Sequence, residues 1–148
     1  MKIAVLACFG EDPHFIDHLG YLAHLFDAPL IVAHKTLFEQ VKKYYPFISN
    51  CYQIKETETS VGSLLQEYEV FFSSHYLALK KWPLQRKENG APAIRTIYCS
   101  HGYSDKGHDS RVMEHFSYED LCFVYGKKMK SFLHLKGVED QGNWITVG

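Results

Sequence analysis

Residues 95 to 110, RTIYCSHGYSDKGHDS, place an apolar run directly before a loop that is dense in titratable side chains. His101 is the side chain of this loop best suited to accept a proton near neutral pH. Gly102 lets the backbone turn sharply and lets a substrate approach it closely. Lys106 could bring an ammonium group toward a phosphate. A base, a glycine and a cation in this order suit phosphoryl transfer, although an ordinary exposed turn has the same composition.

The elements that must position this loop follow from the hydrophobic pattern. Apolar strand-like runs alternate with segments of helical period, which predicts an α/β fold: a doubly wound, mostly parallel sheet with helices on both faces. The near-continuous apolar run of residues 2–8 predicts a strand in the interior of the sheet. The strands are expected at residues 2–8, 30–33, 51–54, 69–73, 93–99, 121–125 and 144–147.

Helices are expected between these strands, at residues 13–26, 36–46, 61–68, 76–82 and 127–136. Thr36 with Glu39 three residues later is the pattern of a capping box, which predicts that Thr36 caps the second helix. Gly137 is expected to end the last helix. The first helix is expected to bury one apolar stripe against the sheet, consisting of Phe15, Leu19, Leu22 and Phe26.

Ligands of doubly wound sheets bind beyond the carboxyl ends of the strands, where loops and helix N-termini converge. Three polar loops are predicted at that edge, after the strands at 2–8, 69–73 and 93–99. Besides His101, Gly102 and Lys106, the substrate-binding residues expected there are Gly10, Ser74 and His75. The first loop lacks GxGxxG spacing and no GxxxxGK[ST] motif occurs, so we expect neither a dinucleotide cofactor nor a P-loop.

Metal ligands and disulfides are not expected. Residues that could converge on a metal are His75, Cys99, His101 and His108, but neighbouring strand residues face opposite sides of a sheet and no carboxylate is suitably placed. The four cysteines have no CxxC spacing, so free thiols in the core are expected. Lys127 and Lys128 begin the last predicted helix, where they oppose its dipole; they either bind an anion or form a solvated face.

Composition excludes several classes of protein. The chain of 148 residues has a net charge of −1 and is the size of one domain. It has no long run of like charge, so a nucleic-acid partner is not expected. Its first residues are too short an apolar run for a signal peptide or a membrane span, and we expect a cytoplasmic protein.

A series of segments in the second half of the chain resembles a known family. In order they read EVFFSSHY, GAPAIRTIYCSHGYSDKG, DLCFVYG, an amphipathic helix and WITVG. This order resembles the N-terminal half of the CDP-glycerol glycerophosphotransferase family, whose members are similar to two-domain GT-B glycosyltransferases. The likeness covers about residues 69–148, and the first half of the chain shares only its βαβα rhythm.

In that family the strand that corresponds to residues 93–99 usually ends in Trp-His-Gly-Thr-Pro, followed shortly by Lys. The present chain has the His, Gly and Lys of this motif as His101, Gly102 and Lys106. It departs from the motif at two places, where Ser100 stands for the Trp and residues 103–104, Tyr-Ser, stand for Thr-Pro.

The resemblance implies that residues 1–148 form one Rossmann-like domain, the acceptor side of a two-domain transferase. Such an enzyme would move glycerophosphate, or a sugar, from a nucleotide-activated donor to an acceptor hydroxyl, with His101 as the general base. The donor would be held mainly by a C-terminal domain beyond Gly148, so the chain alone is expected to be inactive. The family's role in cell-envelope polymer synthesis implies peripheral association with the inner face of the membrane.

Two alternatives remain open at this stage. The first is another GT-B nucleotide-sugar enzyme, either a glycosyltransferase or an epimerase, since fold alone does not decide chemistry. The second is a non-catalytic α/β module that binds a partner through an aromatic surface. The candidate contacts of such a module are Tyr44, Tyr45, Phe47, Tyr52 and Tyr76.

Overall fold

A computed structural model of the chain describes residues 1–7, 14–55, 58–74, 94–100, 116 and 119–147, with the backbone alone for residues 14, 15 and 58–61. These residues form one seven-stranded sheet in the order β3-β2-β1-β4-β5-β6-β7, and every pair of neighbours is parallel. The strands are β1 Ile3–Ala7, β2 Leu30–Val32, β3 Cys51–Gln53, β4 Val70–Ser73, β5 Arg95–Cys99, β6 Leu121–Val124 and β7 Trp144–Thr146. The predicted α/β class is confirmed, and β1 lies in the interior, between β2 and β4.

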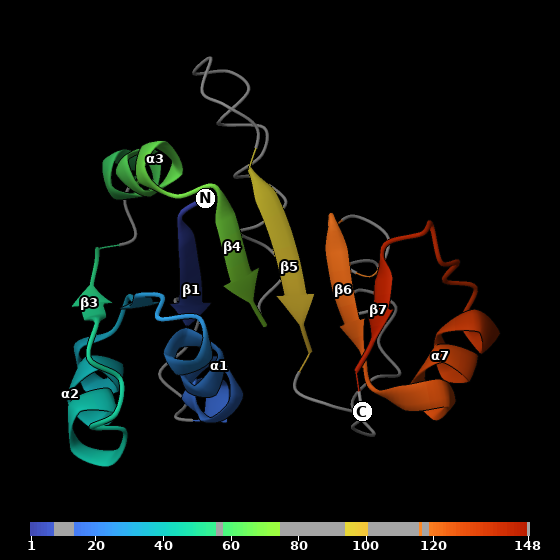
Figure 1. Cartoon of the computed structure of the whole chain (residues 1–148), viewed down its shortest axis with the longest axis horizontal. Helices are drawn as coiled ribbons and strands as arrows, with labels where there is room; N and C mark the ends of the chain where they lie inside the picture. The colour runs from blue at the N-terminus through green and yellow to red at the C-terminus, as the bar shows by residue number, and fades with distance from the viewer. Residues whose placement is uncertain (8–13, 56–57, 75–93, 101–115, 117–118, 148) are drawn as a thin grey trace.

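The described helices cover both faces of this sheet. They are α1 His14–Leu25, α2 Lys35–Tyr44, α3 Glu58–Glu67 and α7 Gly126–Leu135. Residues of α1 and α2 pack in one core cluster with Val5 and Phe72, whereas α3 packs with Leu6 and Phe71 on the opposite side of the same strands. Figure 1 shows α1 and α2 at the β1–β3 end of the sheet and α7 at the β7 end.

Helix α7 lies on the same face as α3. Leu6 is in register with Ser73, and Ser73 with Tyr98, so these side chains share one side of the parallel sheet. Tyr98 packs in one cluster with Met129 and Leu133 of α7. The helices on the two faces make the fold doubly wound, as the sequence predicted, and its strand order is consistent with a Rossmann-like fold.

The buried stripe of α1 differs from the predicted one. Ile16, Leu19 and Ala23 are the fully buried hydrophobic side chains, spaced three and four apart along the side that faces the sheet. Phe26 lies beyond the last residue of α1, and 43% of its surface is exposed. Its ring stacks on Phe72 with centroids 5.1 Å apart, so it covers the edge of the core. Leu22 is half-buried, and the side chain of Phe15 lies outside the described residues.

The predicted capping box of α2 is wrong. The helix begins at Lys35, with His34 at the N-cap position, and no side chain caps it. Thr36 therefore lies within the first turn, where its backbone is helical and cannot take the extended conformation of a cap residue. The start of α2 is explained by packing instead, because Leu37 and Val41 are both buried. Gly137 follows α7 with a φ of 76°, which confirms the predicted glycine stop.

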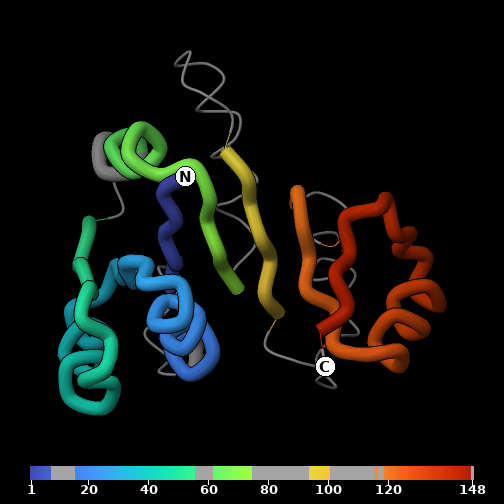
Figure 2. Tube along the Cα trace, viewed as in Figure 1, coloured from blue at the N-terminus to red at the C-terminus, as the bar shows by residue number. Residues whose placement is uncertain are grey.

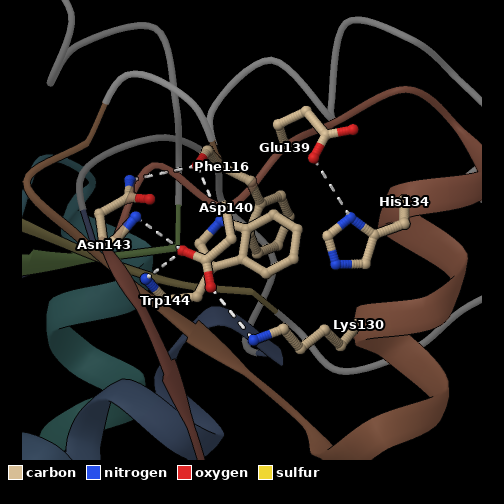
Figure 3. Close-up of polar contacts among 8 residues, drawn as sticks. Phe116, Lys130, His134, Glu139, Asp140, Asn143 and Trp144 are labelled. Carbon is tan, nitrogen blue, oxygen red and sulfur yellow. Dashed lines mark hydrogen bonds and ion pairs between the residues drawn. The ribbon is translucent and has the colours of Figure 1, made fainter.

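Helix α7 is tied to β7 by the loop between them, shown in Figure 3. Asp140 lies at its centre: one carboxylate oxygen accepts hydrogen bonds from the backbone N–H groups of Gly142 and Trp144, and the other lies 3.1 Å from Nζ of Lys130. The Trp144 indole donates to the carbonyl oxygen of Phe116 at 3.0 Å. These contacts join helix, loop and strand, and so orient α7 against the sheet.

The described thiols are free, and no described helix could cross a membrane. Cys99 and Cys122 are buried and Cys51 is half-buried, which confirms the prediction of free thiols for these three; Cys8 lies outside the described residues. None of the helices in the described part of the chain combines the length and the apolar composition of a membrane span.

Candidate functional site

The strand order reverses between β1 and β4. From β1 the chain proceeds outward through β2 to β3, and it then crosses to the other side of β1 and proceeds through β4, β5, β6 and β7. In doubly wound sheets, ligands bind in the crevice outside the carboxyl ends of the strands at such a switch point. Figure 1 shows β1, β4, β5 and β6 side by side with their arrowheads toward the lower edge of the view, and Figure 2 shows the same order in the backbone trace. The candidate site is therefore the carboxyl edge of these strands.

Of the six site residues expected from the sequence, the structure describes Ser74. This serine directly follows β4 and is buried, with 4% of its surface exposed. The other five, Gly10, His75, His101, Gly102 and Lys106, lie outside the described residues. The residues directly before two of these five are described. His75 follows Ser74 at the end of β4, and His101 follows Ser100 at the end of β5. These two strands are direct neighbours in the sheet.

The ends of β5 and β6 are joined by a side chain that sequence reasoning missed. The Tyr125 hydroxyl, next to the end of β6, donates a hydrogen bond of 2.9 Å to the carbonyl oxygen of Ser100. Burial raises the pKa of Tyr125 to about 12, so the hydroxyl keeps its proton at neutral pH. The sequence signal was a tyrosine directly after a buried strand, but nothing local indicated its partner 25 residues away. This bond fixes where the segment of His101 begins.

Helix α7 begins at the same edge, at Gly126, one residue before the predicted start at Lys127. Gly126 has a φ of 74°, a left-handed conformation that glycine adopts without strain, and it turns the chain from β6 directly into the helix. Lys127 and Lys128 consequently lie in the first turn, and both are exposed. The described carboxyl edge thus combines the start of a helix with two cations.

Burial keeps the described thiols of β5 and β6 protonated. The Cys99 side chain is fully buried at the end of β5, and burial raises its pKa to about 12. Burial also raises the pKa of Cys122, and a protonated thiol is neither a nucleophile nor a metal ligand. Within the described ranges, no three His, Cys, Asp or Glu side chains gather in an arrangement that could hold a metal. Of the four residues considered as metal ligands, the structure describes Cys99.

The four described aromatic residues of the binding-module alternative differ in their exposure. Tyr44 and Tyr52 are largely exposed, whereas Tyr45 and Phe47 are half-buried and in contact, with ring centroids 6.0 Å apart. The Tyr45 hydroxyl also donates to the Asp17 carboxylate, which links α2 to α1. Two of the five rings thus have a structural role. Tyr76 lies outside the described residues.

Comparisons of the chain with protein-family models, with curated proteins and with solved structures found no match. The strand order and the helices on both faces define the class of the described structure, a parallel, doubly wound α/β domain. Its carboxyl edge offers backbone donors and positive charge, an arrangement suited to a ligand that carries phosphate.

Proposed function

We propose that this chain is the acceptor-side domain of a transferase that moves glycerophosphate from a nucleotide-activated donor to an acceptor hydroxyl. The observation that carries the proposal is the adjacency of β4 and β5, which are parallel and in register from Val70 with Arg95 to Ser73 with Tyr98. The segments that begin with His75 and His101 therefore leave the sheet from neighbouring carboxyl ends, next to the switch point. The resemblance of GAPAIRTIYCSHGYSDKG to the glycerophosphotransferase motif supplies the reaction class.

The proposed chemistry assigns one role to each motif residue. His101 accepts the proton of the acceptor hydroxyl as its oxygen attacks the phosphorus of the glycerophosphate group. A new P–O bond to the acceptor forms, the P–O bond to the nucleotide breaks, and the nucleoside monophosphate leaves with the electron pair of that bond. Gly102 allows the substrate to approach the backbone, and Lys106 offsets phosphate charge.

The proposal divides the substrates between two domains of a GT-B-like enzyme. The acceptor would bind at the carboxyl edge of this domain, and a second domain beyond Gly148 would hold the nucleotide. A polymer of the cell envelope as product would bring the enzyme to the inner face of the membrane as a peripheral protein. The chain by itself would then bind its acceptor weakly and catalyse no transfer.

Steady-state assays of the protein that contains this chain test the proposal, with CDP-glycerol and nucleotide-sugar donors offered separately. The variant His101→Ala should lower kcat by about 10² to 10⁴, which is the usual contribution of a positioned general base. Donor affinity should remain unchanged, because the donor is assigned to the other domain. His108→Ala is the matched control, a histidine of the same loop outside the motif.

Three results would contradict the proposal. A well-folded His101→Ala variant with full activity would remove the general base, and equal losses in His101→Ala and His108→Ala would indicate a general effect on the loop. Turnover of nucleotide sugars in place of CDP-glycerol would favour the glycosyltransferase alternative.

A further inference from the structure

No acidic side chain of its own first turn compensates the positive potential at the N-terminus of α7. Its N-cap residue, Tyr125, makes no capping hydrogen bond through its side chain, and the first turn contains no acidic residue. The backbone N–H of Tyr125 points to Sδ of Met129 at 3.3 Å. The N–H groups of Gly126, Lys127 and Lys128 lie in the first turn, where a helix provides no acceptor of its own. Two lysine ammonium groups add to the positive end of the helix dipole.

A second, independent feature lies beside this helix start. Ser100 is 7% exposed, and its Oγ is buried without a hydrogen-bond partner. Its backbone carbonyl accepts the 2.9 Å bond from Tyr125, so the serine adjoins the residue at the N-cap position of α7. A buried hydroxyl with no partner is unfavourable for stability, and a bound ion is one way to satisfy it.

The Ser100 side chain is expected on the α7 side of the sheet. Side chains alternate between faces along β5, and Tyr98, two residues earlier, packs against Met129 and Leu133 of α7. Cys99 points to the opposite face and packs in the cluster that contains α1. A serine hydroxyl can turn among three staggered χ1 positions. An anion that arrives at the start of α7 can therefore accept the hydrogen bond that the Ser100 hydroxyl lacks.

We propose that Ser100 and the first turn of α7 form a binding site for a phosphate group. The backbone N–H groups of Gly126, Lys127 and Lys128 and the Ser100 hydroxyl would donate hydrogen bonds to the phosphate oxygens. The ammonium groups of Lys127 and Lys128 would neutralise its charge. Helix N-termini bind phosphate in this manner in many folds. The site requires no catalysis and no second domain, so it does not depend on the proposed function.

The phosphate could belong to a small phosphate ester or to a nucleotide, and the test separates them. The full chain, labelled with ¹⁵N, is titrated with inorganic phosphate, with sn-glycerol 3-phosphate and with cytidine diphosphate. Saturable shifts are expected at the amides of Gly126, Lys127 and Lys128. Tighter binding of glycerol phosphate than of cytidine diphosphate would assign the site to the small ester, and the reverse order would assign it to the nucleotide.

Two variants measure the parts of the site, and a third is their control. Ser100→Ala should weaken phosphate binding about tenfold, because it removes a hydrogen bond to a charged group. Lys127→Gln combined with Lys128→Gln should also weaken binding and should flatten its dependence on salt. The matched control is Lys35→Gln, because α2 likewise begins with an exposed lysine and has no side-chain cap and no acid in its first turn. That control should leave the affinity unchanged.

The stability of Ser100→Ala without phosphate provides a second readout. The variant should unfold at the same temperature as the parent protein or higher, since it removes an unpaired buried hydroxyl. A lower unfolding temperature would show that the hydroxyl has a partner inside the protein and would contradict the proposal. Unchanged affinity in Ser100→Ala, or shifts at the start of α2 as large as those at α7, would mean an adventitious ion only.

Discussion

The Tyr125 hydroxyl and the carbonyl oxygen of Ser100 form a 2.9 Å hydrogen bond that joins the carboxyl ends of β5 and β6. The backbone pairing of the two strands ends with Cys99 opposite Phe123, so the tyrosine extends the connection beyond the ladder. Both partners are at least half-buried. The proposed general base, His101, is attached directly to this anchored residue.

Removing the Tyr125 hydroxyl should therefore affect stability more than the loss of an exposed hydroxyl does. Tyr125→Phe is expected to lower the free energy of unfolding by about 1 kcal/mol, the typical net value of one hydrogen bond with a buried acceptor. Urea denaturation followed by circular dichroism measures this change. Tyr52→Phe is the control, because the Tyr52 side chain is largely exposed, and it should change stability by less than about 0.5 kcal/mol. Equal effects of the two variants would contradict the anchoring role.

Asp120 and Thr96 form a reciprocal pair at the opposite, amino edge of the same two strands. One carboxylate oxygen of Asp120 accepts the backbone N–H of Thr96 at 2.7 Å, and the Thr96 hydroxyl accepts the backbone N–H of Asp120 at 3.3 Å. Asp120→Ala should lower the free energy of unfolding by about 1 to 2 kcal/mol, since it removes a hydrogen bond to a charged acceptor. Glu39→Ala, which removes an exposed partner of Lys35, should change stability little.

A double-mutant cycle separates this pair from general effects on packing. Thr96→Val keeps the shape of the buried side chain and removes its hydroxyl. We expect the combined variant Thr96→Val, Asp120→Ala to be less destabilised than the sum of the two single variants, because they share one set of bonds. Strict additivity would show that the two residues act independently.

Alkaline pH should destabilise the protein through its buried protonated groups. Burial raises the pKa of Cys51 to about 11 and that of Cys99 to about 12, from the ordinary thiol value of 9.0. The folded state therefore binds these protons more tightly than the unfolded state does. Their contribution to stability is fully present below pH 9 and is lost as the pH rises from 9 to 12.

Cys99→Ala tests this dependence on pH. Between pH 9 and 12 the free energy of unfolding should fall less steeply with pH in the variant than in the parent protein. The two slopes should differ by about 1.4 kcal/mol per pH unit, which corresponds to one proton. The slopes are compared rather than the absolute values, because the smaller side chain also leaves a cavity at neutral pH. Denaturation curves at intervals of half a pH unit give the slopes. Parallel curves for the two proteins would contradict the assignment of this proton to Cys99.

The amino-acid sequence by itself determined the class of the fold and most of its elements. The strands at 2–8, 69–73 and 121–125 were predictable because buried parallel strands are apolar on both faces, a pattern that is local in the chain. The glycine after the last helix was predictable because its signal is also local. The residue that ends a helix in the left-handed conformation is usually glycine, whatever surrounds it. The apolar stripe of α1 was predicted only in part. Leu19 is buried as expected, but the predicted stripe also contained Phe26, which lies beyond the end of the helix.

Tertiary structure alone decided the strand order and the partners at the candidate site. The reversal between β1 and β4 depends on pairing between strands more than 60 residues apart in the sequence, for which the chain carries no local signal. The bond from Tyr125 to Ser100 and the pair of Thr96 with Asp120 likewise span 25 and 24 residues. The sequence already predicted that Lys127 and Lys128 begin the last helix, and their place next to the end of β5 follows from the pairing of β5 with β6. Local periodicity encodes which segments become helix or strand, whereas long-range packing decides which side chains come together.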